Sequence, residues 1–81
     1  MLGKLKTSPS EAFGRVLRSL RKERDLSQEG LALEADLQRN YVSLIERGIN
    51  QPTVTTIFKL AVALRLRPSE MVAQVEAETL R

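Results

Sequence analysis

The sequence predicts an all-α domain of five short helices, and three observations lead to that fold class. Apolar residues recur at helical spacing in successive segments of the chain. Serine, threonine or proline stands at the start of most of these segments, where a helix cap is expected. No segment alternates apolar and polar residues as a half-buried strand does. The length of 81 residues suits one domain with a single small core.

The first predicted helix follows a short basic segment, residues 1–7, which we expect to be a flexible arm. Residues 8–81 then form the single domain. Ser8-Pro9-Ser10-Glu11 has the form of a capping box with proline at the first helical position. The apolar residues that follow share one face and predict a helix ending near Arg24; they are Phe13, Val16, Leu17 and Leu20.

Two further helices are predicted between residues 27 and 48. Ser27 can cap the second helix, which follows the apolar Leu26 and turns Leu31, Ala32 and Ala35 inward. Gly30 occupies the position of a capping-box glutamate and weakens this start. The break after the second helix contains Asp36, a residue type that tolerates the left-handed conformation. Gly48 ends the third helix.

The fourth and fifth helices follow a loop that contains Pro52. Thr53 is a plausible cap for the fourth helix, whose inward residues are Ile57, Leu60, Ala61 and Leu64. Pro68 opens the fifth helix, residues 68–79, with Met71, Val72 and Val75 on one side.

The composition excludes several classes of protein. The chain has no cysteine and no histidine, so disulfides, thiolate metal sites and imidazole chemistry are absent, and we expect neither a metal site nor a cofactor. The carboxylates that remain as candidate catalytic groups are scattered over several helices, so we do not expect an enzyme. No segment suits a signal peptide or a membrane span. We therefore expect a non-enzymatic, soluble protein of the cytoplasm.

The net charge of +3 is unevenly distributed. Residues 1–67 hold twelve Lys or Arg and seven Asp or Glu, a balance of +5, whereas residues 68–81 have a balance of −2. The basic part can attract a polyanion, although basic surface alone is weak evidence for one.

A run of hydrogen-bonding side chains opens the third predicted helix: Gln38, Arg39, Asn40 and Ser43. If Val42 and Ile45 face the core, the outer stripe of this helix is polar. Arginine can bind guanine O6 and N7 through two donors, and asparagine or glutamine can pair with adenine N6 and N7. Taken alone, such a run is more often a solvated helix end than a base-reading surface.

The order and spacing of several short motifs resemble the Cro/phage-repressor family of helix-turn-helix regulators. They are Leu26-Ser27-Gln28, Leu31-Ala32, Tyr41-Val42-Ser43, Ile45-Glu46-Arg47-Gly48, Pro52-Thr53, Leu60-Ala61 and Leu64. The resemblance covers residues 13–71, and within the family the chain is most similar to the controller proteins of restriction-modification systems. Asp36 and Gly30 depart from the family pattern, which usually has glycine and glutamate there.

The resemblance implies a lambda-repressor-like fold in which helices two and three form the helix-turn-helix. It implies a sequence-specific transcription regulator that binds a two-fold symmetric operator in double-stranded DNA as a homodimer, with RNA polymerase as a further candidate partner. The alternative is an antitoxin-like or coactivator-like module that uses this fold to bind protein.

Each polar residue of the expected interface receives a role. We expect base reading by Gln38, Arg39, Asn40 and Ser43, and phosphate contacts by Gln28, Tyr41, Arg47 and Thr53. Gln28 and Thr53 stand at helix starts, where backbone N–H groups favour an anion. Arg47 can instead complement its helix end, and Tyr41 can instead pack its ring. The resemblance further suggests that Glu46 pairs with Arg21.

The dimer interface is predicted on the fifth helix, through Met71, Val72 and Val75. The acidic Glu70, Glu76 and Glu78 would keep this end of the domain away from phosphates. The alternative is that the strip only closes the monomer core. Phe58 and Leu64 would then help to form a different dimer surface, or the protein would dimerise only on DNA.

Overall fold

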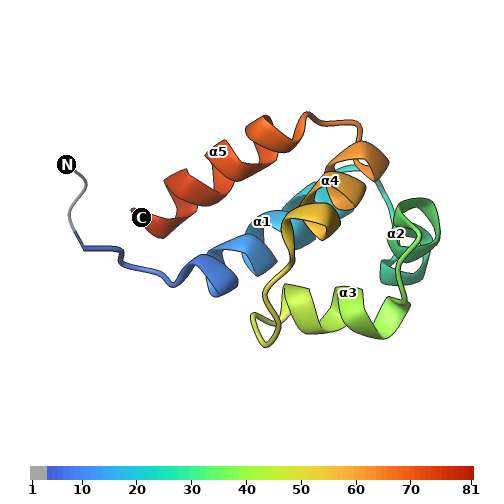
Figure 1. Cartoon of the computed structure of the whole chain (residues 1–81), viewed down its shortest axis with the longest axis horizontal. Helices are drawn as coiled ribbons and strands as arrows, with labels where there is room; N and C mark the ends of the chain where they lie inside the picture. Colours follow the sequence, from blue (N-terminus) through green and yellow to red (C-terminus); the bar gives the residue numbers. More distant parts are fainter. Residues whose placement is uncertain (1–3) are drawn as a thin grey trace.

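Five helices and no strand make up residues 4–81, the part of the chain that the computed structural model describes (Figure 1). The helices are α1 (Pro9–Glu23), α2 (Gln28–Ala35), α3 (Arg39–Glu46), α4 (Val54–Ala63) and α5 (Pro68–Thr79). The predicted all-α fold is confirmed, and no helix among these residues is long and apolar enough to cross a membrane.

The expected basic arm is described only in part, because residues 1–3 lie outside the described residues. The amides of Lys6 and Thr7 donate to the carbonyl of Thr79 at 2.8 and 3.2 Å. The chain just before α1 is therefore tied to the end of α5.

Three helices begin at the predicted caps. The hydroxyls of Ser8, Ser27 and Thr53 each accept from the backbone amide three residues later. Gln38 caps α3 without a side-chain hydrogen bond, so its amide group is not used to close that helix.

Four helices end in the same turn, in which a residue of positive φ is followed by an apolar residue. The residues of positive φ are Asp25, Asp36, Gly48 and Arg65, with φ between 55° and 74°. In each turn the amide of the next residue donates to a carbonyl five positions earlier, as Leu66 does to Ala61 at 2.9 Å. The left-handed conformation predicted for Asp36 is confirmed, with φ 56° and ψ 51°.

Replacement of Arg65 by glycine is expected to stabilise the domain. A side chain held in the left-handed region costs about 1–2 kcal/mol, and glycine avoids this strain. Glycine also loses more conformational entropy when the chain folds, which cancels part of the gain, so the expected net stabilisation is about 0.5–1 kcal/mol. Arg65→Gln removes the same charge but keeps the backbone strain, and it should gain nothing. Urea unfolding of both variants measures the difference, and equal stability of the two would contradict the assignment of strain to Arg65.

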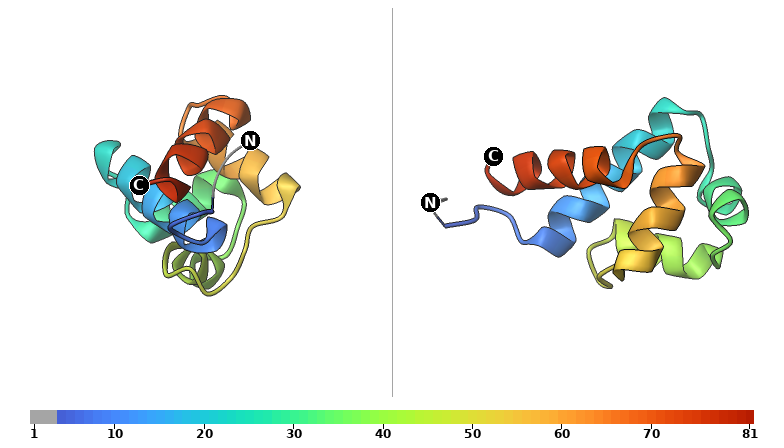
Figure 2. Two further views of the ribbon diagram at one scale, coloured as in Figure 1. Left: turned by 90° about the vertical axis from the view of Figure 1, so that its left-hand side faces the viewer. Right: turned by 45° about the horizontal axis from the view of Figure 1, so that its top comes forward.

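The core lies where α1 passes between α5 and α3 (Figure 1), closed on its remaining sides by α2 and α4. The right-hand view of Figure 2 places α2 at the opposite end of the molecule from the C-terminus. All residues predicted to face inward in the first two helices are buried. The largest fully buried side chains are Leu17, Leu31, Val42, Ile45, Leu60, Leu64 and Met71.

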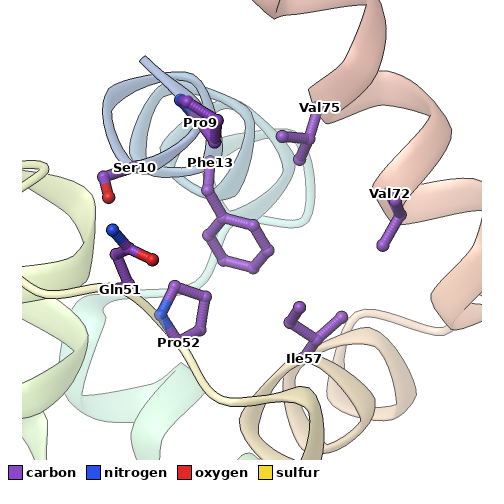
Figure 3. A pocket seen from close by; sticks show the side chains of 8 residues that line it. All are labelled: Pro9, Ser10, Phe13, Gln51, Pro52, Ile57, Val72 and Val75. Carbon is purple, nitrogen blue, oxygen red and sulfur yellow. The ribbon is translucent and has the colours of Figure 1, made fainter.

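The apolar strip of α5 belongs mainly to this core. Met71 is 0% and Val75 9% exposed, because α5 packs against α1 and α4. A side chain buried within its own chain has no surface left for a partner to cover. The dimer-interface prediction is therefore wrong for Met71. Val72 is 47% exposed and Val75 lines an open pocket (Figure 3), so for these two residues it stays a prediction. Leu64 is also fully buried, whereas Phe58 is exposed.

Candidate nucleic-acid interface

The α2–α3 unit presents α3 at the lower edge of the molecule (Figure 1). Gln38, Arg39 and Asn40 are exposed at its start, and Arg47 is exposed at its end. Ser43 lies between them, half-buried. Val42 and Ile45 are fully buried on the opposite side, as their spacing predicted. The polar residues expected to read bases therefore share the outer side of one helix.

The cations of this surface have no acidic partner of their own. The ion pairs found among residues 4–81 involve Arg15, Arg21, Arg24, Lys59 and Arg81, and include neither Arg39 nor Arg47. An exposed guanidinium without a carboxylate beside it can be offered to an external anion or to a base edge at little cost.

A buried ion pair holds the last residue of α3 against α1. Arg21 donates from Nε to Oε2 of Glu46 at 2.6 Å and from Nη2 to Oε1 at 3.0 Å. The two side chains are only 11% and 3% exposed. Donation to Glu46 raises the pKa of Arg21 above its ordinary value, which outweighs the opposite effect of burial. The ion pair suggested by the family resemblance is thus present.

The same two residues also tie down the segment that leads into α2. Arg21 Nη1 donates to the carbonyl of Leu26 at 2.8 Å, and the side-chain amide nitrogen of Gln28, Nε2, donates to Glu46 Oε1 at 3.1 Å. Gln28, which was expected to contact a phosphate, therefore uses one hydrogen of its side-chain amide for a hydrogen bond within the protein. This bond joins the start of α2 to the end of α3. No pattern in the sequence predicted this link.

Gly14 lets α1 approach the end of α3 closely, and this role was not predicted from the sequence. A Cβ atom at this position would lie 2.5 Å from the carbonyl oxygen of Glu46 and 2.6 Å from that of Ile45. A lone glycine within a helical apolar pattern is the one local sign of such an approach. Together with the Arg21–Glu46 pair, this contact fixes the carboxyl end of α3.

Three hydroxyl groups connect α3 with the first turn of α4. The Tyr41 hydroxyl lies 3.4 Å from Oγ1 of Thr56, and Thr53 donates to that same atom at 3.0 Å. The Tyr41 side chain is half-buried against the core, which agrees with the alternative that its ring packs, and its phosphate contact stays a prediction. Thr56, which is 6% exposed, was not identified from the sequence, because an inward threonine on an apolar helix face carries no distinctive pattern.

No group of three or more metal-binding side chains occurs within residues 4–81. The surface combines exposed amides and guanidinium groups on one helix with a rigid support behind that helix. Such an arrangement can recognise a polar, anionic ligand by hydrogen bonds, without any chemical step.

Helix packing and site together define a helix-turn-helix protein, and comparison with known proteins agrees. The sequence model of the Helix-turn-helix family matches residues 17–71, and the chain belongs to this family.

Its relatives include proteins that control restriction-modification systems. The control protein C.MunI from Mycoplasma sp is 40% identical over 67 residues, which cover 82% of this chain and 90% of that protein. The structure of the restriction-modification controller protein C.AhdI from Aeromonas hydrophila shares 44% identity and superimposes with a TM-score of 0.73, over 75% of this chain and 92% of that one. The resemblance inferred from the sequence is confirmed.

A third protein shares the fold at lower identity. The controller protein C.Esp1396I, solved as a tetramer in complex with its natural 35 base-pair operator, is 24% identical with a TM-score of 0.83. The match covers 93% of this chain and 99% of that one.

Proposed function

We propose that this protein is a transcription regulator of the controller type, which binds a specific sequence in double-stranded DNA through α3. The observation that carries the proposal is the run of exposed Gln38, Arg39 and Asn40 at the amino end of α3, where the guanidinium of Arg39 pairs with no carboxylate of residues 4–81. In helix-turn-helix proteins the amino end of the second helix enters the major groove first.

The base-reading residues suit the edges of purines. Arg39 can donate twice to guanine O6 and N7, while Gln38 and Asn40 can each exchange two hydrogen bonds with adenine. The half-buried Ser43 reaches less far, so we assign it a weaker contact to a base.

The phosphate contacts come from residues around that stripe. Arg47 is exposed at the other end of α3 and provides a point of attachment to the backbone. Gln28 and Thr53 stand at the starts of α2 and α4, where free backbone N–H groups and the helix dipole favour an anion. The side chains of Gln28 and Thr53 form hydrogen bonds within the protein, so we assign the phosphate contacts at these helix starts chiefly to the backbone. The Tyr41 hydroxyl also lies next to a protein group, Thr56.

A homodimer acting on a two-fold symmetric operator follows from the size of the domain. One α3 touches only a few base pairs and discriminates poorly among genomic sites, whereas two half-sites multiply the specificity. The operator-bound C.Esp1396I assembly and the relatives named as control proteins support this reading. Such a regulator works in the cytoplasm with the DNA, where RNA polymerase is its candidate partner in transcription.

The test compares Arg39, the first residue of α3, with Arg47, the residue that follows its last. Arg39→Ala should lose about 1–3 kcal/mol on a site selected from random duplexes and should discriminate less at one base position. Arg47→Ala should weaken binding to selected and random duplexes alike, because a phosphate contact carries no sequence information.

Mobility shifts on selected and random duplexes measure both effects. An equal loss on the two kinds of DNA for Arg39→Ala would make Arg39 a phosphate contact instead. If no duplex is shifted or selected, the fold serves another purpose here, such as binding a protein.

A further inference from the structure

A chain of hydroxyl groups runs from the start of α4 to α3. The Thr53 hydroxyl accepts from the backbone amide of Thr56 at 3.1 Å and donates its own hydrogen to Thr56 Oγ1 at 3.0 Å. Thr56 Oγ1 in turn lies 3.4 Å from the hydroxyl of Tyr41, a contact in which either oxygen can be the donor. Thr56 is therefore the central member of this chain, because its Oγ1 contacts both of the other hydroxyls.

The burial of Thr56 favours one direction for its contact with Tyr41. Thr56 is 6% exposed, so its hydroxyl hydrogen needs an acceptor within the protein. Thr53 already donates to Thr56, and the Thr53 oxygen is occupied by the amide. Among residues 4–81 the oxygen of Tyr41 is the acceptor that remains. A buried hydroxyl hydrogen without an acceptor is unfavourable, so we assign Thr56 as the donor and Tyr41 as the acceptor.

This direction leaves the hydrogen of the Tyr41 phenol available to an external group. The contact with Thr56 is the one hydrogen bond that the Tyr41 side chain makes among residues 4–81. A phenol can accept one hydrogen bond and still donate its own hydrogen. The ring is half-buried and packed against the core, so the rotation of the hydroxyl is the main freedom that remains. Donation from Thr56 restricts that rotation and turns the phenol hydrogen away from Thr56.

We propose that Thr56 is a positioning residue for DNA binding, which holds the Tyr41 phenol so that it donates its hydrogen to a backbone phosphate. The proposal rests on the DNA binding of the proposed function and adds a buried residue that supports the phosphate contact of Tyr41. The phosphate groups of the DNA backbone accept hydrogen bonds from tyrosine hydroxyls. If Tyr41 instead donated to Thr56, its hydrogen would be used inside the protein and a phosphate would meet only a lone pair.

The four hydrogen bonds of this chain would all point the same way. They run from the amide of Thr56 to Thr53, back to the Thr56 hydroxyl, on to Tyr41 and from there to the phosphate. Hydrogen bonds aligned in this way strengthen one another. The Thr56–Tyr41 contact of 3.4 Å is long for two hydroxyls, so it directs the phenol more than it stabilises the fold. Loss of the Thr56 hydroxyl should therefore affect binding more than folding.

Raman spectroscopy of the free protein tests the direction of the contact, because Tyr41 is the one tyrosine of the chain and no tryptophan is present. The intensity ratio of the tyrosine doublet is high for a phenol that accepts a hydrogen bond and low for one that only donates. Thr56→Val should lower this ratio, since its methyl group takes the place of the donating hydroxyl. Thr56→Ser keeps the hydroxyl and should keep the ratio. A ratio that rises in Thr56→Val, or does not change, overturns the proposal.

Duplexes with a single methylphosphonate test the phosphate contact. Wild type should lose about tenfold in affinity when the methylphosphonate replaces the phosphate that Tyr41 contacts, as expected for a hydrogen bond to a charged group. Tyr41→Phe should bind the unmodified selected duplex about tenfold more weakly and should lose little more from that replacement. Thr56→Val should lose about two- to threefold on the unmodified duplex and should be less sensitive than wild type to the same methylphosphonate.

Two further variants control for a structural role of Thr56. Thr56→Ser should restore the wild-type sensitivity to this phosphate. Thr55→Val makes the same chemical change at the exposed position before Thr56, and it should keep the wild-type sensitivity as well. Circular dichroism checks that each variant is folded, and Thr56→Ala removes the same hydroxyl if Thr56→Val is not.

The outcomes separate this proposal from the proposed function. If wild type and Tyr41→Phe behave as expected but folded Thr56→Val keeps the full sensitivity to the methylphosphonate, DNA binding stands and the positioning role of Thr56 fails. If wild type binds no duplex, the proposed function fails and the phosphate role of Thr56 fails with it. A lowered Raman ratio in Thr56→Val together with reduced sensitivity to one phosphate supports the proposal.

Discussion

Glu46→Gln is expected to destabilise the domain by about 3 kcal/mol. The substitution keeps the size of the side chain but removes the charge that faces Arg21. Arg21 is only 11% exposed, so its guanidinium would be left desolvated and without a counter-charge. Arg21→Met should lower the stability of the domain by a similar amount, because it leaves the buried carboxylate of Glu46 without a counter-charge.

The double variant Arg21→Met with Glu46→Leu separates the pair from its surroundings. Apolar residues of similar volume often replace a buried ion pair at little cost, so this double variant should be more stable than either single one. Urea unfolding measures all of these variants. Single variants that unfold together with wild type would mean that water reaches the pair and screens it.

The effect on DNA recognition should be indirect. Glu46 lies at the end of α3 that is held against α1, and its carboxylate is occupied by Arg21 and Gln28. At a temperature where the variants are folded, base preference should therefore be unchanged. A changed preference at one base pair would instead make Glu46 part of the reading surface.

Local signals in the sequence were sufficient to predict the helices. Ser8, Ser27 and Thr53 cap the helices that they were expected to cap, since capping depends on a few adjacent residues. The left-handed turns at Asp25 and Arg65 were missed. Arginine rarely marks such a turn, whereas Asp25 is of the residue type that predicted the turn at Asp36 and could have been found by the same signal. In both turns the following leucine is partly buried against the core, so tertiary packing outweighs the local preference.

Contacts between distant segments were harder to predict. Periodicity identified the apolar strip of α5 correctly but could not tell whether α1 or a second chain covers it, and the choice of a second chain was wrong for Met71. The exposed polar stripe of α3 followed from the buried positions of Val42 and Ile45 alone. The Arg21–Glu46 pair spans 25 residues, and only the family resemblance suggested it. The base and phosphate roles of the α3 residues stay predictions.

Gly14→Ala is expected to destabilise the domain although alanine is the better helix former. A methyl group at residue 14 would lie 2.5 and 2.6 Å from two backbone carbonyl oxygens of α3, and backbone atoms cannot rotate away as a flexible side chain can. The helices must therefore separate, at a cost of about 1–3 kcal/mol that exceeds the helix-propensity gain of about 1 kcal/mol.

Gly30→Ala is the matched control for this effect, because it makes the same chemical change inside another helix. Its added Cβ would meet only side-chain atoms, the closest being Ser27 Oγ at 3.2 Å. Gly30→Ala should therefore melt at or above the wild-type temperature, while Gly14→Ala melts below it. Since α3 is displaced in Gly14→Ala, that variant should also bind selected DNA more weakly when folded. Equal melting temperatures for the two variants would show that α1 and α3 can part without cost, and that Gly14 does not fix the position of the reading helix.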